Sequence, residues 1–160
     1  PDPNAGSWAA LGVLMAQVFH RNSGRGWRLR QRSLALWSEW RQQLGARGRS
    51  LPWRPGLLLL ASNHDELERQ QRLIASRRQQ GFSLEAWSRQ QLDALAPALP
   101  EMALGGLFSP HDGQLDPGPA LEALLDAALR LGLQPCCDRA EHLERTAGGW
   151  TVHTLSLIHI

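Results

Sequence analysis

Lysine and tyrosine are absent from this chain of 160 residues, and all 17 of its basic residues are arginine. Together with abundant leucine and alanine, this usage is typical of GC-rich coding sequence and identifies no partner. Cysteine is scarce, since the chain has only Cys136 and its neighbour Cys137. Adjacent residues of a strand face opposite sides, so this pair predicts neither a disulfide framework nor a metal site. We therefore expect no metal and a cytoplasmic location.

Long hydrophobic runs are also missing. The longest, "GLLLLA" at Gly56–Ala61, has the length of a strand, whereas a membrane-spanning helix needs about 20 apolar residues. The start at Pro1 has neither the basic nor the apolar region of a secretory signal. It also lacks methionine, so we expect that Pro1 is not the biological N-terminus. The length and a hydrophobic fraction of 42% suffice for one domain with a core.

The two ends of the chain each carry an unusual feature. At the C-terminus, "LSLIHI" (residues 155–160) resembles the translation of a transposase adapter used in sequencing libraries, so we expect an artefact there and assign it no function. Near the N-terminus lies a run of arginines, namely Arg21, Arg25, Arg28, Arg30 and Arg32. Only Trp27 is interleaved with them, so we expect a solvated helix start and no nucleic-acid partner. The alternative is an arginine-rich face that binds a partner in a salt-sensitive way.

Apolar spacing and turn residues predict a series of elements in the first two thirds of the chain. A helix runs from about Gly26 to Gly45, with Trp37 and Trp40 on one face as core residues. The run at residues 56–62 predicts a buried strand. Capping patterns at Ser62–Glu66 and at Ser88–Gln91 predict one helix to about residue 80 and a short helix near residue 90.

The stretch "LGGLFSPHDGQLDP" contains four polar side chains within six residues, from His111 to Asp116. Asp112 and Gly113 are typical of a turn after a short strand, and Asp116–Pro117 is typical of a helix start. His111 and Asp112 could form an acid–base pair, but no other titratable group is near them in sequence. We therefore favour a structural joint over a catalytic or metal site.

The last part of the chain predicts a helix followed by a hairpin. The helix carries an apolar face that ends at Gly132, and it comprises Leu121, Leu124, Leu125, Ala128 and Leu129. The stretch "LQPCCDRAEHLER" is typical of a strand, Gly148–Gly149 of a turn, and residues 150–154 of a second strand. This order of helices and strands indicates an α/β fold class.

The order and spacing of these pieces resemble the FAD-dependent oxidoreductases of the D-amino-acid oxidase (DAO) family. The pieces are "GSWAALGVL", a helix, "GLLLLAS", two helices, "GGLFSPHDGQLDP", a helix and "LER…GGWTVHT". The resemblance spans about residues 5–154 and is greatest to the glycine oxidases of the thiamine-pathway branch. "DGQLDP" before an apolar helix is the most telling piece.

The resemblance implies a Rossmann-like FAD-binding domain interleaved with an antiparallel-sheet substrate domain. Residues 1–47 would belong to the FAD-binding domain, 48–109 to the substrate domain and 110–154 to the FAD-binding domain again. Gly6 and Ser7 would contact the phosphate and ribose region of FAD. Ala10, Leu11, Gly12 and Val13 would contact the ring system, and Ala140 would hold adenine through its backbone. Small residues suit this task because they leave backbone N–H groups accessible.

Two family elements are missing from the chain. It has no G-x-G-x-x-G motif, which in the family lies just upstream of the position where this chain begins. The family's substrate-binding arginine lies downstream of the position where this chain ends. The resemblance therefore implies a fragment, marginally stable and inactive alone, of an oxidase that acts on a small amino acid or amine. No catalytic acid or base is required, since hydride passes from substrate to FAD and O₂ reoxidises the flavin. The alternatives are a sarcosine oxidase, a D-amino-acid dehydrogenase or a non-catalytic interaction module.

Overall fold

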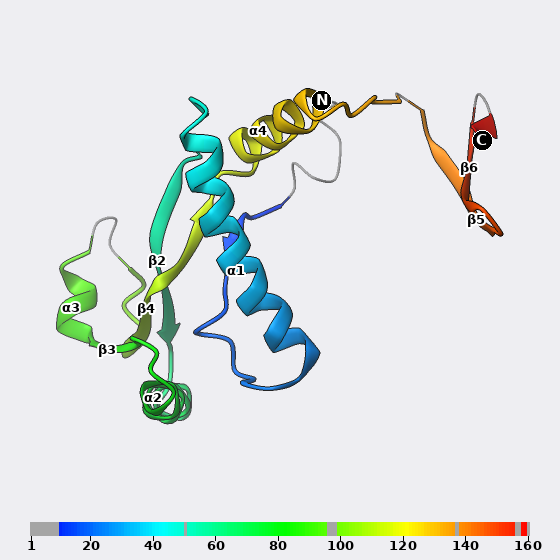
Figure 1. The fold of residues 1–160 in the computed structure, drawn as a ribbon. Coiled ribbons are helices and arrows are strands. Elements are labelled where there is room, and N and C mark those ends of the chain that lie inside the picture. The colour runs from blue at the N-terminus through cyan, green and yellow to red at the C-terminus, as the bar shows by residue number, and fades with distance from the viewer. Residues whose placement is uncertain (1–9, 50, 96–98, 137, 156–157, 160) are drawn as a thin grey trace. The chain divides into compact units, whose positions relative to one another are not determined.

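The computed structural model describes residues 10–49, 51–95, 99–136, 138–155 and 158–159 (Figure 1). The chain divides into two compact units between Leu125 and Asp126, inside the helix α4 (Pro117–Arg130). No helix in these described ranges has the length and apolarity needed to cross a membrane.

The first unit is organised around the strand β4 (Gly105–Leu115), to which three other strands are hydrogen-bonded, all antiparallel. β2 (Trp53–Ala61) pairs with β4 along one edge (Figure 1). On the other edge, β3 (Glu85–Ser88) pairs with the first residues of β4 and β1 (Val13–Leu14) with residues 113–114. β4 therefore sets the register of the whole sheet.

Three helices of the first unit confirm the sequence prediction, namely α1 (Gly24–Gly45), α2 (His64–Gln79) and α3 (Arg89–Asp93). At the start of α2, the Asn63 side chain accepts the Glu66 N–H at 2.9 Å. Ser88 and Gln91 form the expected capping box before α3. These caps satisfy N–H groups that a helix start leaves without partners.

The core of the first unit lies between α2 and the sheet. Val18, Ile74, Leu84 and Leu107 form a buried cluster, against which partly buried leucines of β2 pack. On α2, only Ile74 and Arg77 are buried, which confirms that most of this helix faces solvent.

The helix α4 begins and ends as the sequence predicts. The Asp116 carboxylate accepts the Gly118 N–H at 3.2 Å, so Asp116 caps the helix before Pro117. At the other end Gly132 has φ +95°, and the next N–H donates back to the Ala128 carbonyl. The predicted apolar face is only partly buried: Leu125 and Leu129 are exposed, whereas the small residues Ala120 and Ala123 are buried.

The second unit contains an antiparallel sheet in the order β5-β6-β7, formed by β5 (Ala140–Thr146), β6 (Gly149–Thr154) and β7 (Ile158–His159). The predicted hairpin is confirmed. The predicted strand over residues 133–136 is wrong, because the strand begins only at Ala140. Pro135 has no N–H to donate to a ladder, which disfavours a strand there.

Two expectations about burial are wrong in the first unit. Trp37 and Trp40 share a helix face and make an edge-to-face contact, with ring centroids 5.4 Å apart, but Trp40 is exposed rather than core. The strand β2 is half-buried rather than buried over most of its length. β2 lies at an edge of the described sheet, so it is paired on one side only.

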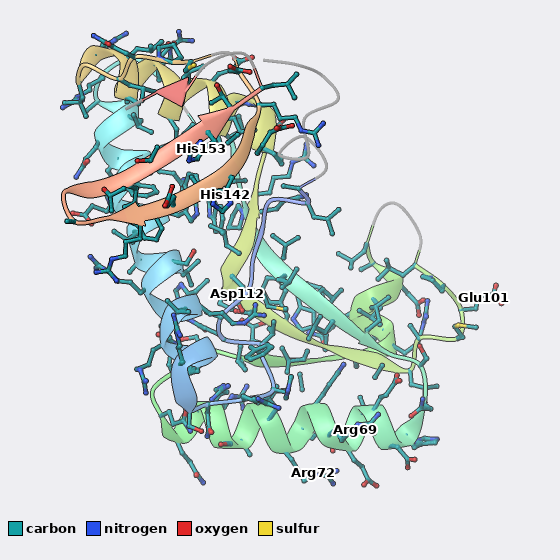
Figure 2. All side chains as sticks on the ribbon, turned by 90° about the vertical axis from the view of Figure 1, so that its right-hand side faces the viewer. Arg69, Arg72, Glu101, Asp112, His142 and His153 are labelled. Atoms are coloured by element: carbon teal, nitrogen blue, oxygen red, sulfur yellow. The ribbon has the colours of Figure 1, made fainter. Side chains whose placement is uncertain are left out.

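The predicted turn at Asp112–Gly113 is also wrong, because both residues lie inside β4. Asp112 is 0% exposed, and Figure 2 shows it in the interior of the unit. Its carboxylate accepts the N–H groups of Ala16, Gln17 and Val18 at 2.8, 3.0 and 2.9 Å. These three donors satisfy the buried charge, so Asp112 serves as a structural anchor for the segment after β1.

Two arginines hold the carbonyl groups of the same segment. Arg77 of α2, 0% exposed, donates to the carbonyls of residues 17, 19 and 21 at 3.1, 2.6 and 2.9 Å. Burial lowers the pKa of Arg77, and the charge of Asp112 opposes that shift. Arg30 of α1 donates to the Met15 carbonyl at 3.2 Å. The backbone from residue 15 to 21 is thus bound by charged side chains from three elements.

We expect Asp112→Asn to lower the free energy of unfolding by about 2–4 kcal/mol. The charge of the carboxylate is lost, and the new NH₂ group replaces one acceptor oxygen and faces a buried backbone N–H from which it cannot accept. Asp116→Asn is the matched control, since asparagine caps a helix about as well as aspartate. The midpoint of urea unfolding, followed by tryptophan fluorescence, measures both. Equal midpoints for the two variants would contradict the anchoring role of Asp112.

Candidate functional site

The segment "GSWAALGVL" begins outside the described residues, so nothing is established for Gly6 and Ser7. Its described part starts as an irregular loop at Ala10, and Val13–Leu14 then forms β1. The predicted loop is therefore correct for residues 10–12, and the last two residues differ because they pair with β4. Leu11 is 76% exposed, and Val13 is also exposed.

Gly12 packs closely against the end of β4. Its φ of +66° lies in the left-handed region, and its carbonyl accepts the Leu115 N–H at 2.9 Å. A Cβ placed on Gly12 would lie 2.0 Å from the Leu115 carbonyl oxygen. Only glycine therefore fits both the backbone conformation and the available space.

The loop forms one rim of an open apolar groove of about 620 Å³. The opposite wall comes from the end of β4 and the first turns of α4. The groove is lined by Ala10, Leu11, Gly12, Val13, Leu14, Trp37, Leu115, Pro117, Ala120, Leu121 and Leu124. These lining residues include no charged side chain. All four predicted ring-contact residues thus line this groove.

A second groove, of about 390 Å³, lies beside the first and shares Leu14 and Trp37 with it. Its polar side chains are Gln31, Ser38, Arg41 and His111. The guanidinium of Arg41 stacks over the Trp53 ring at 4.9 Å from the centroid. His111 lines this groove, whereas the Asp112 carboxylate is engaged by backbone N–H groups, so the two do not form an acid–base pair.

Ala140 lies in the second unit, where it is the exposed first residue of β5 and pairs with Thr154. On the same hairpin, His142 and His153 face each other, with ring centroids 5.5 Å apart (Figure 2). His153 also lies 3.5 Å from the Glu144 carboxylate. In the part of the chain that the structure describes, no group of three acidic, histidine or cysteine side chains could hold a metal ion.

Sequence reasoning missed two contributors to the first groove. The sequence predicts Trp37 as a core residue, because helical spacing cannot distinguish a helix face that packs in the core from one that lines a groove. The Gln114 side chain donates to the Leu11 carbonyl at 2.8 Å and so contacts the loop directly. Its only signal in the sequence is its place in "DGQLDP".

Gly12→Ala should destabilise the first unit by at least about 2 kcal/mol, because the added Cβ overlaps the Leu115 carbonyl and the positive φ disfavours alanine. Gly26→Ala in α1 is the control, since a Cβ there meets no atom within 4 Å. Alanine is the better helix residue, so the control should be neutral or slightly stabilising. Urea unfolding midpoints test this difference, and an unaltered midpoint for Gly12→Ala would refute the close approach.

Comparison with solved structures shows that this fold is similar to part of several larger enzymes. Glycine oxidase from Geobacillus kaustophilus superposes with a TM-score of 0.82 at 24% identity, over 97% of this chain and 43% of that one. L-proline dehydrogenase from P. horikoshii gives 0.74 at 20% identity, over 96% and 40%. Iminodiacetate oxidase from Chelativorans sp. BNC1 gives 0.79 at 18% identity, over 96% and 42%. The chain thus spans less than half the length of each.

Comparison with curated protein sequences yields no match. The sequence model of the DAO family, described as FAD dependent oxidoreductase, matches residues 1–158, which is nearly the whole chain. The mixed α/β fold with antiparallel sheets agrees with that assignment. The chain belongs to the DAO family of FAD-dependent oxidoreductases.

Proposed function

We propose that this chain supplies the ring-contacting surface of an FAD-dependent amine or amino-acid oxidase, most like a glycine oxidase. The observation that carries the proposal is the apolar groove whose rim is residues 10–13. The family resemblance predicts that rim as the ring contact, and all four of its residues line the groove. The activity belongs to the full-length protein that carries this chain.

The residues of the groove fit the flavin ring chemically. An isoalloxazine ring is flat and binds by stacking against apolar surface and by hydrogen bonds to backbone groups. Ala10 and Gly12 have little or no side chain to keep such a ring from the backbone. The exposed side chains of Leu11 and Val13 offer apolar surface at the rim. Trp37 and the leucines of α4 complete the wall.

The resemblance supports assignments for the remaining parts of FAD. Gly6 and Ser7 would hold the phosphate and ribose region, with the Ser7 hydroxyl as a donor. The backbone of Ala140 would hold adenine, and the exposed start of β5 is compatible with such a contact. When bound, FAD supplies the redox chemistry by accepting a hydride from the substrate and passing electrons to O₂. The role of this chain is to orient the ring and to exclude water from its face.

The substrate proposed is a small amino acid or amine. The three relatives compared above are named for glycine, L-proline and iminodiacetate, which share an amine next to a carboxylate-bearing carbon. Two of them are oxidases and one is a dehydrogenase, so the electron acceptor distinguishes the two variants of the proposal. Glycine oxidase chemistry, and with it a place in thiamine biosynthesis, is the variant we favour because the resemblance is greatest there.

The full-length protein should purify with bound FAD, visible as flavin absorbance, and should release hydrogen peroxide when given a small amino acid. A peroxidase-coupled assay with glycine, sarcosine, L-proline and iminodiacetate measures the second property. Dye reduction without peroxide would indicate a dehydrogenase instead. Because the flavin does the redox work, no single acid or base in residues 10–155 should abolish activity by loss of proton transfer alone.

The contradictory outcome is a protein that purifies colourless and stays free of flavin when FAD is added. That result would favour an interaction module that uses the exposed arginines in α1 and just before it. Arg21, Arg25, Arg28 and Arg32 are exposed, whereas Arg30 packs over the Phe19 ring at 3.9 Å. Binding that weakens steeply with salt would then be expected.

A further inference from the structure

Four consecutive residues of β4 each hold a different part of the segment from Leu11 to Val18. These four residues are Asp112, Gly113, Gln114 and Leu115, the "DGQL" of the sequence motif. The two stretches run antiparallel, so the later residues of β4 hold the earlier residues of the segment. The motif thus contacts the ring-contact loop and the segment that follows it.

The backbone of the motif holds the middle of the segment. Gly113 pairs with Leu14, and Gln114 pairs with Val13, in the β1–β4 ladder. The Leu115 N–H donates to the Gly12 carbonyl at 2.9 Å. Gly113 also lies against β2, where a Cβ would approach the Arg54 carbonyl oxygen to 2.4 Å. These contacts are made by backbone groups, and at Gly113 they leave no room for a side chain.

The side chains of the motif hold the two ends of the segment. The Gln114 Nε2 donates to the Leu11 carbonyl at 2.8 Å, inside the loop that rims the groove. The Asp112 carboxylate accepts the three N–H groups of residues 16–18 beyond β1. Each of these contacts requires a particular side chain, an amide donor in one case and a carboxylate in the other. The loop between them has little freedom to shift.

We propose that Gln114 and Asp112 are positioning residues that fix the flavin-contact loop against β4, with Gln114 acting on the rim itself. This inference rests on the proposed function, since it takes residues 10–13 as the ring contact. Gln114 touches the loop and not the ring, and it acts by holding the Leu11 carbonyl. Cofactor sites require their contacting groups to be held within a fraction of an ångström, so releasing Leu11 should weaken and alter ring binding.

The test compares Gln114→Glu with Gln114→Leu in the full-length protein. Both remove the donor, and glutamate also places a negative charge against the Leu11 carbonyl. We expect the Kd for FAD to rise about tenfold for Gln114→Glu and less for Gln114→Leu, as the loss of one hydrogen bond with added repulsion predicts. The visible circular dichroism of bound flavin should change, while the urea unfolding midpoint should stay close to that of the parent protein.

Gln43→Glu is the matched control, because Gln43 is exposed on α1 and does not line the groove. It should leave the FAD Kd and the flavin spectrum unchanged. An unchanged Kd and spectrum in Gln114→Glu would overturn the positioning role, and so would equal effects of Gln114→Glu and Gln43→Glu.

A second measurement without flavin separates this inference from the proposed function. Amide hydrogen exchange of Gly12, Val13 and Leu14 should be faster in Gln114→Glu than in Gln43→Glu when no FAD is present. If the parent protein binds no FAD, the proposed function fails, and faster exchange would still support the contact of Gln114 with the loop. If the parent protein binds FAD and exchange is unchanged, the positioning role fails alone.

Discussion

The buried carboxylate of Asp112 is the contact on which the arrangement of the first unit depends. It satisfies three consecutive backbone N–H groups that would otherwise lie unpaired in the interior, and those groups belong to a segment without regular structure. Arg77 and Arg30 satisfy carbonyls of the same segment from the helices on either side. One strand and two helices are therefore connected through a short segment whose backbone N–H and carbonyl groups bind charged side chains. The segment has a defined path without needing a helix or a strand of its own.

The groove follows from this arrangement. Once residues 15–21 are fixed, β1 is held in register with the end of β4, and the loop before β1 projects beside the start of α4. Asp116 caps α4 directly after β4, so one short stretch, residues 112–117, contacts the loop on one side of the groove and begins the wall on the other side. This explains in physical terms why "DGQLDP" is the most telling piece of the family resemblance. Within this motif one residue anchors the segment after β1, others pair with β1 and its loop, and another caps α4. Few substitutions preserve all three roles.

Local signals were sufficient to predict most of the elements. Capping residues such as Asn63, Ser88 and Asp116, and glycines such as Gly132, fix helix ends through contacts within a few residues, so they can be read directly. The role of Asp112 could not be predicted from the sequence, because its partners lie more than 90 residues away. Aspartate followed by glycine is instead typical of a turn. The groove-lining role of Trp37 was hidden for the same reason: its surroundings are set by tertiary contacts. The family resemblance, not periodicity, is the source of the prediction that residues 10–13 contact the flavin ring, and this stays a prediction.

The sequence separation of these anchors has a consequence for how the protein folds. The partners of residues 11 and 16–18 lie 94 to 103 residues further along the chain. During synthesis the loop therefore emerges early and has nothing to pair with until β4 has been made. Contacts over such separations carry a large loop-closure cost and form late in folding. The groove is thus completed only after the end of β4 has been made, so a polypeptide that stops before residue 114 contains the whole loop sequence but lacks the part of the strand that contacts it.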